Sequence, residues 1–202
     1  MTAPAPAFRF GFLVAAAFAA ACMCAAPPAF AAEGNGQSAE QGTVESLDTL
    51  FDELKASESE GEAKGIEQKI WSAWNHSGSA TIDLFMSRAG DAMGAKDYGV
   101  AMQLLDTVIE LKPDYAEGWN RRATLHYVMK NYGESIGDIQ HTLALEPRHF
   151  GAMSGLGAIL RTLGEKDGAY EIYTRALAVN PFLKGAQEAI DDLREDVRGR
   201  GI

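Results

Sequence analysis

The chain has 202 residues, 47% of them hydrophobic, and a formal net charge of −10. So acidic a chain is a poor match for nucleic acid or an anionic membrane surface, because phosphate groups select basic patches. Its two cysteines, Cys22 and Cys24, both precede residue 32. The remainder of the chain therefore has no disulfide, no thiolate nucleophile and no cysteine-bound metal.

Residues 1–31 have the pattern of a secretory signal peptide. Arg9 supplies a short positive region, and the apolar run Phe10–Ala21 that follows is too short for a stable membrane span. The segment 29–31 reads Ala-Phe-Ala, the pattern of small residues at a cleavage site. We therefore expect cleavage after Ala31 and a periplasmic or secreted protein, with no transmembrane segment in the mature chain.

Cys22 allows a second interpretation of the same region. Small residues precede it, as they do in bacterial lipoprotein signals, and a lipid on Cys22 would anchor the mature N-terminus to a membrane. Ala19, however, stands where such signals usually carry leucine or another large aliphatic residue. We therefore favour cleavage after Ala31 over lipidation at Cys22.

Residues 32–42 are polar and glycine-rich without periodicity, which predicts a disordered linker. Two stretches with helical spacing of apolar residues follow, separated by the polar loop 57–62. We therefore expect a helical hairpin over residues 43–78. Its apolar positions are Leu47, Leu50, Phe51 and Leu54 in the first helix and Ile66, Ile70, Trp71 and Trp74 in the second.

The rest of the chain follows a period of 34 residues. Pro113, Pro147 and Pro181 fall at this spacing, each after a stretch with helical periodicity. Proline ends a helix because it has no N–H to donate and clashes with the preceding turn. A period of this length indicates a stack of helical hairpins, in which each unit buries its apolar face against the next.

The residues that recur with this period resemble those of the tetratricopeptide repeat family. That pattern has small residues where the two helices of a repeat cross and large residues at the seam to the next repeat. Arg88, Arg122 and Thr142 depart from it. The matching residues are Phe85, Ala89, Ala101, Leu105, Val108 and Pro113 in the first copy; Trp119, Ala123, His126, Ser135, Ile139 and Pro147 in the second; and Met153, Leu156, Gly157, Leu160, Gly164, Ala169, Tyr173, Ala176 and Pro181 in the third.

The resemblance implies an all-α fold, a right-handed superhelical solenoid of helical hairpins with a C-terminal capping helix. Segments 116–124 and 146–152 also resemble stand-alone, secreted members of the family from Gram-negative bacteria. The expected parts are a degenerate, repeat-like hairpin over 43–78, three repeats over 82–115, 116–149 and 150–183 within residues 79–198, a capping helix over 184–198, and a frayed tail over 199–202.

In this family the first helix of each repeat lines a groove that holds a partner protein. The resemblance therefore implies a groove that runs from a methionine-lined end through a polar middle, suited to an extended peptide. Met86 and Met93 could instead pack against the N-terminal hairpin. The groove residues that it implies are Met86, Met93, Glu117, Asn120, Thr124, Tyr127, Ser154 and Arg161, with Gly90, Val128, Gly151, Ala158 and Thr162 at further inward positions.

Catalytic chemistry finds little support among the histidines. His126 occupies a packing position of its repeat, and His141 is expected on the outer surface. His149 is expected to be solvated or to start a helix, with the groove as an alternative. No pair has the i, i+4 spacing of a helical zinc site, and there is no nucleophile elbow or phosphate-binding glycine loop. We expect no enzyme, no cofactor and no metal.

These observations lead to one hypothesis and one alternative. The hypothesis is a non-enzymatic protein–protein interaction module or scaffold of the bacterial envelope, which holds a peptide segment or partner protein in the groove. The alternative is a self-assembling protein without a foreign ligand, in which Trp71 and Trp74 form part of a homo-oligomer surface. The sequence does not identify the partner.

Overall fold

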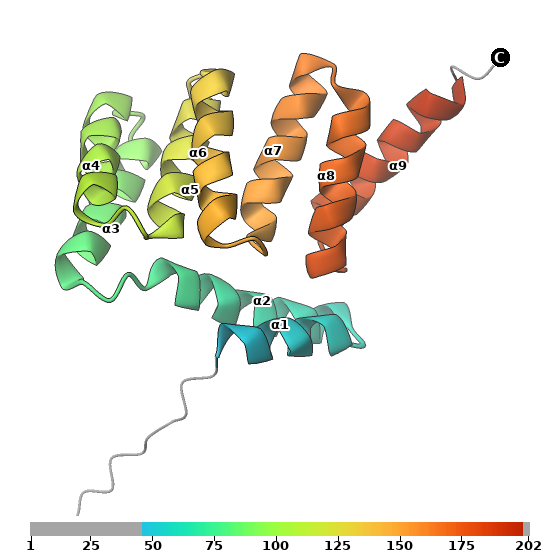
Figure 1. Ribbon diagram of the computed structural model, residues 1–202, viewed down its shortest axis with the longest axis horizontal. Coiled ribbons are helices and arrows are strands. Elements are labelled where there is room, and N and C mark those ends of the chain that lie inside the picture. Colours follow the sequence, from blue (N-terminus) through green and yellow to red (C-terminus); the bar gives the residue numbers. More distant parts are fainter. Residues whose placement is uncertain (1–45, 200–202) are drawn as a thin grey trace, which may run out of the picture. The chain divides into compact units, whose positions relative to one another are not determined.

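The computed structural model of the protein describes residues 46–199. This part of the chain contains nine helices and no strand, and it lies within one compact unit, Thr43–Ile202. The predicted signal peptide, Cys22 and the linker lie outside the described residues. The helices are α1 Leu47–Ala56, α2 Glu60–Asn75, α3 Ala80–Gly94, α4 Tyr98–Leu111, α5 Ala116–Val128, α6 Tyr132–Leu145, α7 Phe150–Leu163, α8 Lys166–Val179 and α9 Lys184–Gly199 (Figure 1).

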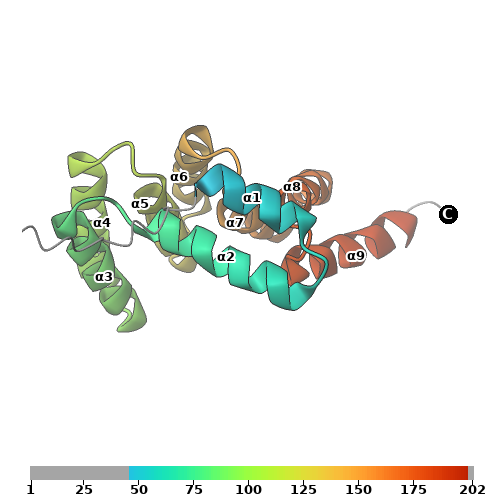
Figure 2. The ribbon, with the colours of Figure 1, turned by 90° about the horizontal axis from the view of Figure 1, so that it is seen from below.

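Six of these helices form three hairpins, α3 with α4, α5 with α6 and α7 with α8. The hairpins stand side by side in two rows, with α3, α5 and α7 in one row and α4, α6 and α8 in the other (Figures 1 and 2). Each hairpin packs on the next through α4 against α5 and α6 against α7. The predicted all-α solenoid of helical hairpins is therefore confirmed.

Small residues bring the two helices of a hairpin close together. Between α5 and α6, the buried Ser135 hydroxyl donates to the Ala123 carbonyl oxygen over 2.7 Å. Between α7 and α8, a Cβ atom on Gly157 would lie 2.6 Å from the ring of Tyr173. A side chain at position 157 would force the buried Tyr173 ring to move, so glycine is favoured at this crossing.

The first helix of each hairpin ends in the same turn, repeated every 34 residues. Lys96, Lys130 and Gly164 follow α3, α5 and α7, and their φ angles are 60°, 64° and 82°. A residue with a Cβ atom loses roughly 1–2 kcal/mol in this left-handed region, whereas glycine adopts it freely. Only the third of the three turns has the residue type that the backbone favours.

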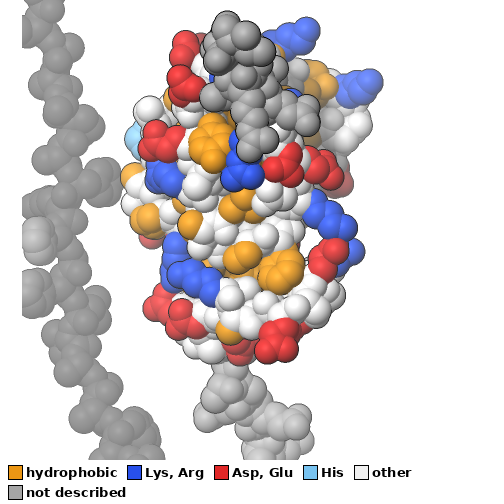
Figure 3. Space-filling view, turned by 90° about the vertical axis from the view of Figure 1, so that its right-hand side faces the viewer, with side chains coloured by type: hydrophobic (Ala, Val, Ile, Leu, Met, Phe, Trp, Pro, Cys, Tyr) orange, Lys and Arg blue, Asp and Glu red, His pale blue; other side chains and the backbone are white. Residues whose placement is uncertain are grey.

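Helix α9 covers the end of the solenoid. Ala186, Ile190 and Leu193 are buried against Ala169 and Tyr173 of α8. Viewed from the α9 side, acidic and basic side chains are interspersed with small groups of apolar ones, without a continuous apolar face (Figure 3). Within residues 46–199, no helix combines the length and the apolar character needed to cross a membrane.

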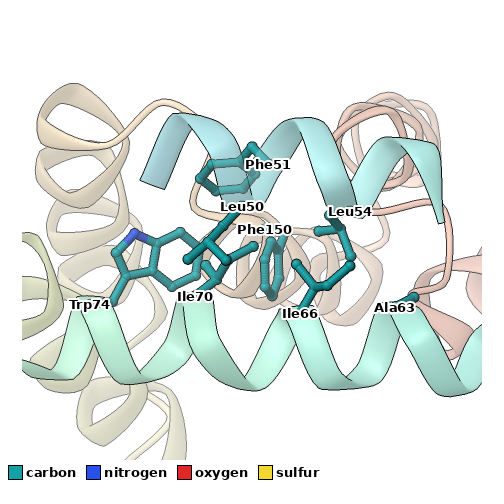
Figure 4. Packing of buried hydrophobic residues seen from close by; sticks show 8 residues of the cluster. All are labelled: Leu50, Phe51, Leu54, Ala63, Ile66, Ile70, Trp74 and Phe150. Atoms are coloured by element: carbon teal, nitrogen blue, oxygen red, sulfur yellow. The ribbon is translucent and has the colours of Figure 1, made fainter. Parts of the chain in front are cut away.

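Helices α1 and α2 form a hairpin that lies across the turns before α7 and α9 (Figures 1 and 2). Phe150, the first residue of α7, inserts into the apolar core of this hairpin (Figure 4). Ion pairs of 2.7 Å join Asp48 to Arg148 and Glu60 to Lys184 at the edges. A degenerate repeat at this place in the chain would stack against α3. The hairpin instead packs its apolar stripe on the turns before α7 and α9.

The three equivalent turns allow a matched test of backbone strain. We expect Lys130→Gly to raise the free energy of unfolding by about 0.5–1 kcal/mol, because relief of the left-handed strain exceeds the added entropy of the unfolded chain. Gly164→Ala should lower it by about 1 kcal/mol, since the new Cβ atom would have no neighbour within 4 Å and the change acts through the backbone alone. Urea unfolding measures both. Changes of equal sign would contradict this account.

Candidate functional site

A pocket of about 130 Å³ lies between α5, α6 and α7. Three of the groove residues implied by the sequence, Asn120, Thr124 and Tyr127, lie at its mouth. The mouth residues are at least partly exposed and the floor residues are buried. The mouth comprises Asn120, Thr124, Tyr127, Gly151, Gly155 and Ala158, and the floor comprises Ala123, Ser135, Ile139, Ala152 and Ile159.

Glycine and alanine on α7 leave the space that forms this pocket. Gly151, Gly155 and Ala158 lie about one helical turn apart along the side of α7 that faces α5. A Cβ atom on Gly155 would lie 3.8 Å from the Ile139 side chain, an ordinary contact distance, so a small side chain at position 155 would occupy the pocket without a clash. The floor is apolar except for the Ser135 hydroxyl, which already donates to a carbonyl.

Hydrogen bonds orient the polar groups at the mouth. Asn120 donates through Nδ2 to Glu117 Oε2 over 2.8 Å, which turns its acceptor Oδ1 away from Glu117. Thr124 donates its hydroxyl proton to the Asn120 carbonyl over 3.0 Å and keeps its oxygen lone pairs. Both side chains therefore present acceptors at the mouth, the groups that a peptide N–H requires.

Two of the other groove residues implied by the sequence are buried instead. Met86 is 4% exposed and packs in the core between α3 and α4, and Glu117 is 3% exposed. Met93 is half-buried against the same core. Met86 faces the core because it lies on the same side of α3 as Ile82 and Ala89, both buried there.

Ser154 and Arg161 lie on α7, outside the pocket lining. The Ser154 hydroxyl donates to the Phe150 carbonyl oxygen over 2.9 Å. Arg161 is exposed, and its Nη2 lies 3.5 Å from Asp192 of α9. Burial raises the pKa of Tyr173, and nearby Arg161 partly opposes that rise. These residues extend the polar surface toward α9 but do not form the pocket.

His149 ties three parts of the chain together beside this pocket. Its side chain is fully buried, and its Nδ1 accepts a hydrogen bond from the backbone N–H of Ala152 over 3.1 Å, which caps the start of α7. Because Nδ1 accepts, the ring proton of neutral His149 lies on Nε2, which donates to Glu117 Oε2 over 3.2 Å. Trp74 of α2 stacks on the ring, with centroids 4.1 Å apart.

The N-terminal hairpin contacts α5 and the start of α7 beside the pocket. A Cβ atom on Gly151 would lie 2.6 Å from the ring of Trp71, so the indole occupies the space at the first turn of α7. Asn75, the last residue of α2, accepts from Arg121 Nη2 over 2.9 Å. Trp74 is 6% exposed. Trp71 and Trp74 therefore make contacts within the chain.

Glu117 is a buried carboxylate surrounded by donors. Burial by itself would raise its pKa, but hydrogen bonds from His149 and Asn120 and the positive charge of Arg121, whose Nη2 lies 3.1 Å from Oε1, outweigh that effect. The pKa of Glu117 is therefore lower than its ordinary value. Among the described side chains, no group of three His, Cys, Asp or Glu is arranged to hold a metal ion.

Sequence patterns did not reveal this cluster. His149 starts a helix, as one of the expectations stated, but it is buried rather than solvated. Its partners lie 32 residues away at Glu117 and still further away at Trp74. The one local signal was the placement of Trp71 and Trp74 on an apolar stripe, which showed that these rings needed a partner but did not identify it.

Comparison with known proteins supports the repeat architecture. No family model matches the chain. A TPR repeat-containing protein of Rhizobium etli is 44% identical over 176 residues, which cover 85% of this chain and 86% of that protein. Heat shock protein STI1 of Saccharomyces cerevisiae is 26% identical over 124 residues, 60% of this chain but only 21% of STI1.

Solved structures share the fold at low sequence identity. The first TPR domain of Spaghetti (RPAP3), bound to the HSP90 peptide SRMEEVD, matches with a TM-score of 0.56 and 18% identity over 59% of this chain and 95% of that one. The Sgt2 TPR domain from Aspergillus fumigatus matches with a TM-score of 0.56 and 19% identity, over 61% of this chain and 84% of that one. Both likenesses concern the fold alone.

The lowered pKa of Glu117 predicts a loss of stability in acid. Ionised Glu117 stabilises the fold above its ordinary pKa of 4.5, and this contribution disappears as the pH falls through the lower folded-state pKa. We expect the free energy of unfolding, measured in urea, to fall between about pH 5 and pH 3. Asp83, whose pKa is also lowered, acts in the same direction.

The free energy of unfolding of the Glu117→Gln variant should fall less steeply over this pH range than that of the native chain. The control variant Glu171→Gln changes an exposed residue on α8, and its free energy of unfolding should fall as that of the native chain does. If Glu117→Gln and the native protein lost stability in parallel, Glu117 would not be the source of the pH dependence.

Proposed function

Since the chain belongs to the tetratricopeptide repeat (TPR) family, which the Rhizobium etli relative shows, we propose that it is a protein-interaction module that holds an extended segment of a partner protein at the pocket between α5 and α7. The observation that carries this proposal is the pocket itself. It combines an apolar floor with hydrogen-bond acceptors at the mouth. This combination is suited to a peptide that inserts a side chain while its backbone stays at the surface.

The size of the pocket selects the side chain. A dry apolar cavity of about 150 Å³ holds one benzene molecule. A pocket of about 130 Å³ that is open at one side therefore suits an aliphatic side chain such as that of valine, and is too small for the double ring of tryptophan. The partner segment would carry an aliphatic residue at the centre of the contact.

The mouth would hold the partner's backbone. Asn120 Oδ1 and Thr124 Oγ1 can each accept from a peptide N–H, and Tyr127, 38% exposed, offers a ring face and a hydroxyl beside them. Each direct contact of this kind contributes on the order of 1 kcal/mol. The RPAP3 domain was solved with a peptide bound to it. This supports peptide binding as the mode of use of the present chain.

The same proposal includes an envelope location. The Arg9-led apolar run and the Ala-Phe-Ala segment before residue 32 support export, so the partner would be an envelope or secreted protein and the module would act there as a scaffold. The alternative, a homo-oligomer formed through the N-terminal hairpin, stays a prediction. No observation favours it, because Trp74 packs inside the chain.

A library of random extended dodecapeptides displayed on phage tests the proposal while the partner is still unidentified. We expect selected peptides to share an aliphatic residue and to bind the purified chain in solution by calorimetry. Gly155→Val fills the pocket and should weaken binding at least about tenfold, or about 1.4 kcal/mol. Tyr127→Ala should weaken it by a similar factor, with little change in Tm because Tyr127 is exposed.

The matched control is Gln140→Ala, on the exposed side of α6, which should leave binding unchanged. Selected peptides that bound Gly155→Val as tightly as the native chain, or that lost affinity equally with Gln140→Ala, would refute the pocket as the binding site. Light scattering of the same samples over a range of concentrations tests the homo-oligomer.

A further inference from the structure

A second cleft lies on the opposite side of α5 from the pocket. It is open, has a volume of about 590 Å³, and is walled by α4 and α6 with α5 at its floor. We call it the α4–α6 cleft. Its lining residues are Met102 and Asp106 of α4, Trp119, Arg122 and His126 of α5, and Glu134, Gly137, Asp138 and His141 of α6.

An ion-pair network occupies the floor of the α4–α6 cleft. Arg122 stands where the repeat pattern usually has leucine. It donates through Nε and Nη2 to the two carboxylate oxygens of Asp138, each over 2.8 Å, and through Nη1 to Asp106 over 2.7 Å. The Asp138 carboxylate is buried, whereas the Asp106 side chain is 54% exposed. One guanidinium therefore bridges two carboxylates, and a third carboxylate, Glu134, lies at the exposed rim.

The groups left over in the cleft are hydrogen-bond acceptors. Nδ1 of His126 is buried and has no hydrogen-bond partner among the described residues, while its Nε2 lies 3.9 Å from Asp138 Oδ2. This nitrogen is closed off from solvent, so a ligand in the cleft does not reach it. The acceptors within reach of a ligand are the carboxylate oxygens of the exposed residues Asp106 and Glu134. Three carboxylates against one guanidinium leave the cleft with an excess of negative charge.

Aromatic and apolar groups complete the cleft. The Trp119 and His141 rings stack with centroids 4.2 Å apart, and Trp119 Nε1 donates to the Pro113 carbonyl over 2.9 Å, which fixes the indole. Met102 provides an adaptable thioether on the facing wall. Gly137 leaves the α6 wall without a side chain, and a Cβ atom there would meet nothing within 4 Å.

We propose that the α4–α6 cleft binds an arginine side chain of a basic segment in a partner protein. The planar guanidinium has five N–H donors and no acceptor, which matches a cleft whose exposed carboxylates, Asp106 and Glu134, can only accept. The arginine stem would lie along Met102 and the rim of the Trp119–His141 stack, and the positive charge would offset the carboxylate excess. This site is separate from the peptide pocket and does not depend on the proposed function.

The probe is a blocked hexapeptide of alternating glycine and arginine, measured by calorimetry against the full chain at low salt. The same peptide with citrulline, which keeps the shape and removes the charge, should bind at least tenfold more weakly. The lysine version should also be weaker, because an ammonium has three donors and no planar fork. The Trp119 indole N–H resonance should shift on addition of the arginine peptide.

Two variants test the place of binding by independent routes. Gly137→Leu fills the cleft without a change of charge, and Glu134→Gln removes a rim charge without filling space. Each variant should bind the arginine peptide at least fivefold more weakly than the native chain does. The matched control Glu171→Gln on α8 removes an equal charge elsewhere, and Tyr127→Ala alters the peptide pocket. Both should leave the affinity unchanged.

Absence of binding, equal affinity for the citrulline or lysine peptide, or unchanged affinity in Gly137→Leu would overturn the proposal. If Tyr127→Ala lost affinity for the arginine peptide, the peptide would bind at the pocket between α5, α6 and α7, and the proposed arginine site would be wrong. Far-ultraviolet circular dichroism and Tm of each variant establish that the chain is folded.

Discussion

The buried imidazole of His149 is the contact on which the arrangement of this protein depends. One ring nitrogen caps α7, the other donates to Glu117 of α5, and the ring face stacks on Trp74 of α2. A single side chain thus fixes the start of one repeat, its spacing from the previous repeat and the position of the N-terminal hairpin. An uncapped helix or an unpaired buried carboxylate would each be unfavourable, so the three contacts support one another.

Helix α5 stands between the two proposed sites and contributes to both. Asn120, Thr124 and Tyr127 lie on one side of it, at the mouth of the pocket, whereas Trp119, Arg122 and His126 lie on the other, in the α4–α6 cleft. Both sets recur at intervals of three or four residues, as neighbours on one side of a helix must. One helix can therefore serve an apolar pocket and a charged cleft without sharing a side chain between them.

The repeat architecture could be predicted from the sequence because its causes are local. Proline at the end of a helix and apolar residues at helical spacing act within one or two turns of chain, and their recurrence marks the repeats. The position of the hairpin and the burial of His149 depend on partners more than 30 residues away, which no local pattern encodes. Met86 shows that the family pattern also has this limit within a repeat. The pattern implied that Met86 faces the groove, but its side chain packs in the core of its own hairpin.

The hairpin formed by α1 and α2 alters how this solenoid should come apart. In a simple repeat array each unit contacts only its neighbours, so end units open independently and stability is a sum of local terms. Here hydrogen bonds join the hairpin to the repeats between residues that are 46 to 113 positions apart in sequence. The pairs are Asn75 with Arg121, Asp48 with Arg148 and Glu67 with Asn180. The hairpin therefore links repeats that would otherwise contact only their neighbours. Opening one turn exposes the core shared with the others, so amide exchange should report one cooperative unit rather than a gradient from end to end.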